Sequence, residues 1–364
     1  MEDVTSERAR ILAELKAVND SRVTLAREYN QAMTSLTCRE ADLHARLCAL
    51  RVPPTALLPM SLWERVFLFL TDSWDIVAVL FTCRDFRDLI LPNPNFPLVL
   101  ACSAGVTNGL LALLAGVHTI DLSGCEGVSD AGVRALAGVH TISLSGCHNI
   151  TDEGVKTLTG VHTISLSGCN LITDAGVKAL AGAQVVYLSH CSNVTDEGVR
   201  ALAGVHTLSL SGCHRITDAG VCALAGVHTI SLFGCSNITD VGVRALAGVH
   251  TVNLSRCPRV TDEGVRALGG AHTVNLYKCS ALTDAGVQAL SGVHTINLSD
   301  CSLITDEALR AIAGAKVIDL SHCVRITDEG VRYLQGAHKI KLRGCPLVSE
   351  AMIQGLERLM RTAR

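Results

Sequence analysis

Aromatic side chains are scarce in this chain: they make up 3% of its 364 residues, whereas hydrophobic residues make up 48%. A core with so few rings must be built from Leu, Ile, Val and Ala, which is typical of stacked repeats. An excess of positive charge is also missing, because the formal net charge is −3. The sequence therefore predicts no binding to nucleic acid or to an anionic membrane.

Long apolar runs are absent as well. The longest apolar stretch, residues 65–81, is interrupted by Asp72 and Asp75, so no helix that spans a bilayer is expected. The first ten residues, MEDVTSERAR, lack the apolar core of a signal peptide. We therefore expect a soluble protein of the cytoplasm or the nucleus, and we expect its 16 cysteines to be reduced thiols.

Residues 1–50 contain neither proline nor glycine, and their apolar side chains recur at helical spacing from Ile11 to Leu50. This pattern predicts an N-terminal helix. Two arrangements remain open, because Arg22 and Arg39 interrupt the apolar stripe: a short coiled coil that makes a dimer through residues 11–50, or an amphipathic helix packed on its neighbour.

Residues 52–94 differ in composition, since prolines stand at both ends and both tryptophans lie between them. The stretch predicts a small all-α domain with a ring-packed core. Its motifs Leu58-Pro59, Val66-Phe67 and Cys83-Arg84-Asp85-Phe86 resemble an F-box, although Ser61 and Thr71 depart from that pattern. The resemblance implies docking on the small adaptor of a cullin-RING ubiquitin ligase. The adaptor-binding residues it implies are Leu58, Pro59, Leu62, Trp63, Val66, Phe67, Ile76, Val79, Cys83 and Phe86.

The rest of the chain repeats itself. Eleven cysteines, from Cys125 to Cys345, follow one another at intervals of 22 residues in the frame V-x-x-I-x-L-x-x-C-x-x-I-T-D-x-G-V-x-x-L-x-G. The frame resembles the cysteine-containing class of leucine-rich repeats, which implies an α/β solenoid with a curved parallel sheet and convex helical turns. Because these copies are short for that class, we expect turns rather than full helices. Residues 95–355 are assigned to the solenoid with an entry cap near residues 100–116, and residues 346–364 to a C-terminal cap helix.

Each repeat carries a cysteine and an aspartate, and nine copies carry a histidine. We interpret the cysteines as buried thiols bonded to loop backbone rather than as a metal site, because no C-x-x-C pair occurs. Strand alternation places the histidines in phase with the inward Ile and Leu, with half-exposure, and a pH-sensing role stays open. We expect Thr or Asp to cap each turn, and Asp to pair with Arg or Lys four residues later.

No catalytic constellation stands out, because every copy repeats the same residues and an enzyme needs a single distinctive site. We therefore expect a protein without enzymatic activity and without a cofactor. On the concave face, several copies depart from the internal consensus of small residues. The predicted substrate-binding residues are Tyr187, His190, Phe233, Arg256, Tyr277, Lys278, Asp300, His322 and Arg343. Random drift after duplication is the alternative explanation.

An F-box followed at once by such repeats resembles the F-box and leucine-rich repeat protein family. The resemblance implies a substrate-recognition subunit of a cullin-RING ubiquitin ligase, with a protein substrate on the concave face. The alternative is a protein-binding scaffold that is not coupled to ubiquitination.

Overall fold

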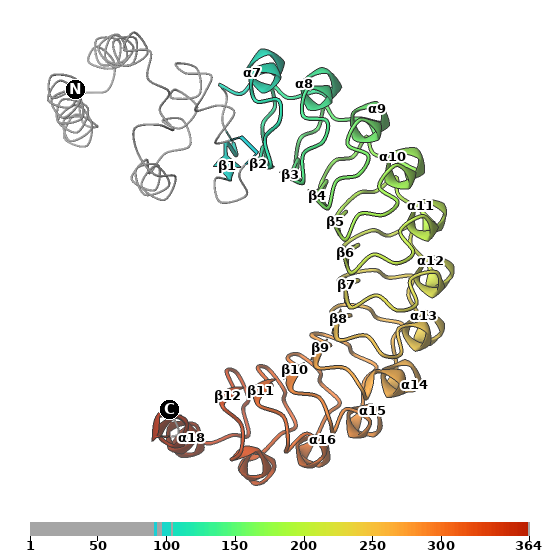
Figure 1. Cartoon of the computed structure of the whole chain (residues 1–364). Coiled ribbons are helices and arrows are strands. Elements are labelled where there is room, and N and C mark those ends of the chain that lie inside the picture. The colour runs from blue at the N-terminus through green and yellow to red at the C-terminus, as the bar shows by residue number, and fades with distance from the viewer. Residues whose placement is uncertain (1–90, 93–96, 103–104, 363–364) are drawn as a thin grey trace, which may run out of the picture. The chain divides into compact units, whose positions relative to one another are not determined.

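The computed structural model describes residues 91–92, 97–102 and 105–362 (Figure 1). The chain divides into two compact units, Met1–Val99 and Leu100–Arg364. The helix predicted over residues 1–50 and the predicted adaptor-binding residues from Leu58 to Phe86 lie outside the described residues. In the first unit, strand β1 covers Leu98–Val99.

Within the second unit the strands form one parallel sheet in chain order, and paired residues are 22 positions apart. The strands are short because only the Thr-Ile-Ser portion of each frame is extended. Their bounds are Thr119–Asp121 (β2), Thr141–Ser143 (β3), Thr163–Ser165 (β4), Val185–Tyr187 (β5), Thr207–Ser209 (β6), Thr229–Ser231 (β7), Thr251–Asn253 (β8), Thr273–Asn275 (β9), Thr295–Asn297 (β10), Val317–Asp319 (β11) and Lys339–Lys341 (β12).

Each strand is followed by a loop and a helix on the opposite, convex side, so the sheet lines the inner side of the arc (Figure 1). The helices are Asn108–Leu113 (α7), Asp130–Arg134 (α8), Asp152–Lys156 (α9), Asp174–Lys178 (α10), Asp196–Arg200 (α11), Asp218–Cys222 (α12), Asp240–Ala245 (α13), Asp262–Val265 (α14), Asp284–Gln288 (α15), Asp306–Ala311 (α16), Asp328–Val331 (α17) and Glu350–Thr362 (α18); the 3-10 turns are Arg266–Leu268 (η1) and Arg332–Leu334 (η2). From α8 to α17 they run four to six residues, which confirms the expected short turns. Within the described residues, no helix is long and apolar enough to cross a membrane.

The core is a stack of aliphatic layers. In the repeat that contains β3, the side chains of Ile142, Leu144, Cys147, Val155 and Leu158 are all buried. Each of the remaining repeats places residues of the same types in these positions. Among the described residues no aromatic side chain is in the core. Burying each Leu or Ile contributes roughly 1.5–3 kcal/mol, so the scarcity of rings is compensated by the number of identical layers.

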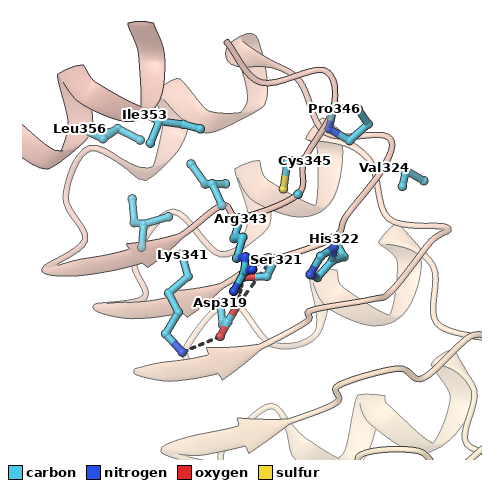
Figure 2. Close-up of a pocket in the computed structure, with 13 residues that line it drawn as sticks. Asp319, Ser321, His322, Val324, Lys341, Arg343, Cys345, Pro346, Ile353 and Leu356 are labelled. Atoms are coloured by element: carbon cyan, nitrogen blue, oxygen red, sulfur yellow. Dashed lines mark hydrogen bonds and ion pairs between the residues drawn. The ribbon is translucent and has the colours of Figure 1, made fainter. Parts of the chain in front are cut away.

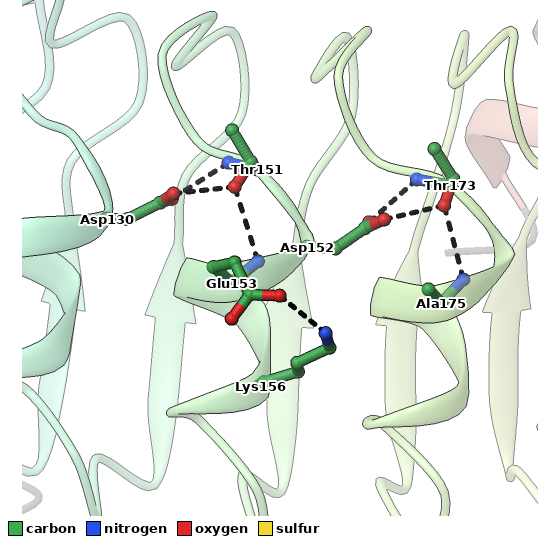
Figure 3. Close-up of polar contacts among 7 residues, drawn as sticks. All are labelled: Asp130, Thr151, Asp152, Glu153, Lys156, Thr173 and Ala175. Carbon is green, nitrogen blue, oxygen red and sulfur yellow. Dashed lines mark hydrogen bonds and ion pairs between the residues drawn. The ribbon is translucent and has the colours of Figure 1, made fainter.

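A polar ladder joins the convex turns (Figure 3). Asp130 accepts a hydrogen bond from the backbone N–H of Thr151 at 2.8 Å and another from its hydroxyl at 2.6 Å. The Thr151 hydroxyl in turn accepts from the N–H of Glu153, so Thr is the N-cap, as expected. Asp152 repeats the arrangement with Thr173 in the next copy.

The predicted pairing of Asp with a cation four residues later is wrong. The aspartate carboxylates bond to the following repeat, and Lys156 instead pairs with Glu153 at 2.6 Å. The physical reason is that a backbone N–H and a hydroxyl hold the Asp130 carboxylate in place. A Cβ added to Gly154 would press on this same carboxylate, which explains the glycine two positions after most of these aspartates; Asp306 is followed by Ala308 instead.

The polar ladder also identifies the two ends of the array. At the entry, Asn108 stands where later copies have Asp, and its amide bonds to Ser129 through both of its polar atoms. At the exit, the N–H of Ser349 donates to Asp328 at 2.7 Å, and α18 follows directly with Leu356 buried. The helix predicted near the C-terminus therefore begins at Glu350.

Candidate functional site

The concave face is formed by the side chains on either side of the buried leucine at the end of each strand, such as Leu144. In the first repeats most of these are serines whose hydroxyls bond to each other across neighbouring strands. Ser145 lies 2.6 Å from Ser165, and Ser211 lies 2.8 Å from Ser231. Because these hydroxyls already have protein partners, this part of the face offers few free polar groups.

A ring–guanidinium–ring stack interrupts the serines further along. The Arg256 guanidinium carbon lies 5.6 Å from the centre of the Phe233 ring and 5.4 Å from that of the Tyr277 ring. Its Nη2 also donates to the Tyr277 hydroxyl at 3.4 Å. Arg256 is exposed and both rings are half-buried. The structure thus brings together three of the predicted substrate-binding residues, from three consecutive repeats.

Five of the predicted substrate-binding residues share an unusual backbone conformation. The position before each ladder cysteine is glycine in six copies, with φ from 69° to 77°. The other five copies place side chains on this left-handed backbone, at a cost of roughly 1–2 kcal/mol each for an L-residue. They are His190 (φ 60°), Arg256 (57°), Lys278 (59°), Asp300 (58°) and His322 (64°).

Lys278 directly follows Tyr277, whereas the other remaining predicted substrate-binding residues lie in repeats outside the stack. Tyr187, on β5, is 38% exposed, and its strand partner in the next repeat is Ser209. His190 follows in the same repeat, two copies away from Phe233. These two residues therefore lie outside the stack.

A hollow of about 840 Å³ lies between β12 and α18, with His322 and Arg343 among its lining residues (Figure 2). Lys341 forms an ion pair with Asp319 at 2.8 Å across its floor. Although partial burial opposes ionisation of Asp319, bonds from Lys341 and Ser321 lower its pKa below the ordinary value. Ile353 and Leu356 of α18 give the hollow an apolar wall.

Three asparagines were not among the predicted site residues, although they occupy the same outward slot in consecutive strands. Asn253, Asn275 and Asn297 pair in register on β8, β9 and β10. The signal was present in the sequence, because this slot is mostly serine in the earlier copies. Serine and asparagine in this slot differ in the hydrogen bonds that their side chains make, and only the fold reveals these bonds.

The cysteine ladder is structural, as predicted. All eleven thiols are buried, and each Sγ donates to the carbonyl of a leucine 25 residues earlier; for Cys213 and Leu188 the distance is 3.0 Å. Burial raises the pKa of Cys213 to about 11 and that of Cys235 to about 12, so these thiols stay protonated. Within the described part of the chain, no group of three or more metal-ligating side chains converges.

The histidines do not lie where strand alternation placed them. His140, His162 and the others that stack are exposed, apart from the half-buried His118, because each precedes the first strand residue and alternation does not yet apply. Neighbouring rings stack at 4.4–4.7 Å in two series that Gln184 separates. Each Nδ1 lies 3.0–3.2 Å from the hydroxyl of the following threonine rather than bonding to a loop carbonyl.

Comparisons with known proteins agree with this geometry. The family model described as Leucine Rich repeat matches residues 117–137, 139–158, 161–181, 184–203, 205–225, 249–269, 293–313 and 316–334. No curated protein sequence matches the chain.

Among solved structures, a chain of the Rad7 and Elc1 complex of yeast is 16% identical, with 84% of this chain and 94% of that chain covered and a TM-score of 0.47. TLR13 in its complex with ssRNA13 is 17% identical, with 68% and 39% covered and a TM-score of 0.52. An internalin (inlF) of Listeria monocytogenes is 16% identical, with 74% and 93% covered and a TM-score of 0.51.

The likenesses to TLR13 and to the internalin show a shared fold. Together with the family matches and the 22-residue register of the sheet, they establish what the array is. Residues 117–334 form a solenoid of leucine-rich repeats.

Proposed function

We propose that the repeat array is a protein receptor that binds its partner on the concave face, at the stack of Phe233, Arg256 and Tyr277. The observation that carries this proposal is the stack itself. Arg and Tyr side chains dominate the binding energy of protein interfaces, usually near their centre. Here they are held together in advance, which lowers the entropy that binding must remove.

The left-handed backbone at Arg256 and Lys278 supports the same proposed binding site. Glycine occupies this position in six copies without strain, whereas Arg256 and Lys278 hold a left-handed backbone that costs stability, and both side chains are exposed. Strained residues retained at a surface are typical of functional sites. Two of the five copies that depart from glycine here, those with Arg256 and Lys278, adjoin the pair of stacked rings.

We propose that residues 52–94 dock on the adaptor of a cullin-RING ubiquitin ligase, so that the array presents a protein substrate for ubiquitination and carries out no chemistry itself. The F-box resemblance of the sequence supports this extension. A scaffold uncoupled from ubiquitination is the competing function.

Two measurements test the two halves separately. Full-length protein is mixed with the recombinant adaptor, and co-purification is expected for the wild type but not for a variant in which Leu58 and Pro59 are both changed to Ala. Failure of the wild type to bind the adaptor at micromolar concentration would establish the scaffold function instead.

The second measurement concerns the stack. Partners captured by cross-linking to the wild-type protein should be lost when Phe233 and Tyr277 are both changed to Ser, the residue of the neighbouring copies. Tyr333→Ser is the matched control, because Tyr333 is 45% exposed but lies on the convex side in η2. Partners that survive the double change, or that are lost equally in the control, contradict the proposed site.

A further inference from the structure

The three asparagines beside the stack hold their amides in one orientation. The N–H of Ser255 donates to Oδ1 of Asn253 at 3.0 Å, that of Tyr277 to Oδ1 of Asn275 at 3.1 Å, and that of Ser299 to Oδ1 of Asn297 at 2.9 Å. A backbone N–H can only donate, so the atom that accepts must be the amide oxygen. The position of each Nδ2 follows from the same bond.

Each of these amide nitrogens can donate two hydrogen bonds. Within the described residues, none of the three Nδ2 atoms has a protein acceptor, and no buried side-chain polar atom lacks a partner. The donors therefore lie on the solvent-accessible concave face. Strand pairing places them in consecutive positions about 4.8 Å apart. The result is a row of donors, whereas the serines of earlier repeats bond to each other.

Positive charge flanks this row. Arg256 and Lys278 precede the ladder cysteines of the same copies, and both are exposed. No carboxylate in the described part of the chain pairs with these two side chains. Two acids adjoin this surface: Asp300, one copy further on, and Asp319, the strand partner of Asn297, whose carboxylate forms an ion pair with Lys341. A ligand rich in acceptors and in negative charge fits this surface.

We infer that the partner's bound segment is an extended acidic peptide, whose carboxylates accept from the asparagine amides and face Arg256 and Lys278, while an apolar side chain covers the stacked rings. This inference deepens the proposed function and rests on it. A protein segment fits better than a nucleic acid, because its carboxylates can be spaced to avoid Asp300 and Asp319. A nucleic acid backbone carries a charge at every phosphate and would meet these carboxylates.

A displayed library of random twelve-residue peptides, panned on the full-length protein, tests the inference. Peptides enriched in Asp and Glu are expected, and added salt should weaken their binding. Changing Asn253, Asn275 and Asn297 together to Ser should weaken the enriched peptides at least tenfold. Serine is a residue that this slot already accepts in other copies.

The matched control changes three other asparagines to Ser: Asn149, Asn193 and Asn237. Their Nδ2 atoms already donate to backbone carbonyls of the preceding repeat, at 2.7–2.8 Å, on the loop side of the array. This variant should bind the enriched peptides as the wild type does. Thermal unfolding of both variants establishes that each is folded.

Four results would overturn the inference. The first three are enrichment of neutral or basic peptides, equal weakening in the two triple variants, and tighter binding of a twelve-nucleotide single-stranded RNA that is abolished when Asn253, Asn275 and Asn297 are changed to Ser. The fourth is enrichment of peptides that need Phe233 and Tyr277 but not the three asparagines, which would leave the proposed receptor function standing. The receptor function itself is tested separately, by the variant in which Phe233 and Tyr277 are both changed to Ser, which should lose every partner.

Discussion

Replacing Cys213 by Ala probes whether the cysteine ladder stabilises the array. The thiol is fully buried, and its Sγ donates to the carbonyl of Leu188 at 3.0 Å. That carbonyl also accepts from the N–H of Cys191 at 3.2 Å. The substitution therefore leaves the carbonyl with a partner, and its cost comes from lost burial, an empty volume and one weak hydrogen bond.

These contributions can be estimated separately. Removing a buried group of about the size of a methylene costs roughly 0.8 kcal/mol in transfer free energy. A cavity of about 20 Å³ costs about 0.5 kcal/mol at roughly 24 cal/mol per Å³. A weak thiol hydrogen bond adds about 0.5 kcal/mol, at the low end for neutral pairs. The free energy of unfolding should therefore fall by about 2 kcal/mol.

Urea unfolding of the full-length protein measures this change. With a slope of roughly 3 kcal/mol per molar urea, the midpoint should fall by about 0.6 M. Cys222→Ala is the matched control, because Cys222 is exposed in α12 and Ala is a good helix former. Its midpoint should barely change.

Thiol reactivity gives a second readout. The raised pKa of Cys213, about 11, keeps the thiol protonated, so it should react slowly with a disulfide reagent at pH 8, whereas Cys222 reacts quickly. A Cys213→Ala variant as stable as Cys222→Ala would refute the packing argument. Stoichiometric zinc in the purified protein would do the same.

Three further predictions concern the polar ladder of Asp and Thr, the left-handed position before the ladder cysteines, and the stacked histidines. Asp240→Ala removes both bonds to Thr261, at 2.8 and 2.7 Å, and should lower the free energy of unfolding by about 2 kcal/mol; no loss in urea unfolding would show that the inter-repeat bonds are dispensable. Lys278→Gly relieves a left-handed backbone (φ 59°), so it should raise the urea midpoint by the equivalent of about 1 kcal/mol, and a fall would contradict the strain. Desolvation within the stack of rings, and then the charges of His206 and His250, lower the pKa of His228, so the unfolded chain binds more protons below pH 6.5, and stability present above that pH is lost as the pH falls through the folded pKa. His228→Gln should make melting temperature less dependent on pH between 7 and 5, and an unchanged slope would refute the role of the stack.

Local patterns along the chain determined the architecture. The 22-residue interval, the apolar frame and the Thr–Asp step predicted a solenoid with short convex turns, buried thiols and threonine caps, and the structure confirms each of them. They were predictable because a repeat cannot bury its apolar face alone, so its only stable arrangement is to stack on a copy of itself. The predicted docking of residues 52–94 on an adaptor remains a prediction.

Contacts between repeats determined the features that the sequence did not predict. The sequence marked Arg256 as a departure from glycine, but only the fold shows that its backbone is left-handed and that its guanidinium lies between two rings. The sequence paired Asp130 with a cation in its own helix, whereas the fold gives the carboxylate to Thr151 of the next copy. It also placed His140 on the inward face, although strand alternation begins only one residue later, at Thr141. In each case the deciding partner lies about 20 residues away or at an element boundary, and spacing within one repeat carries no information about either.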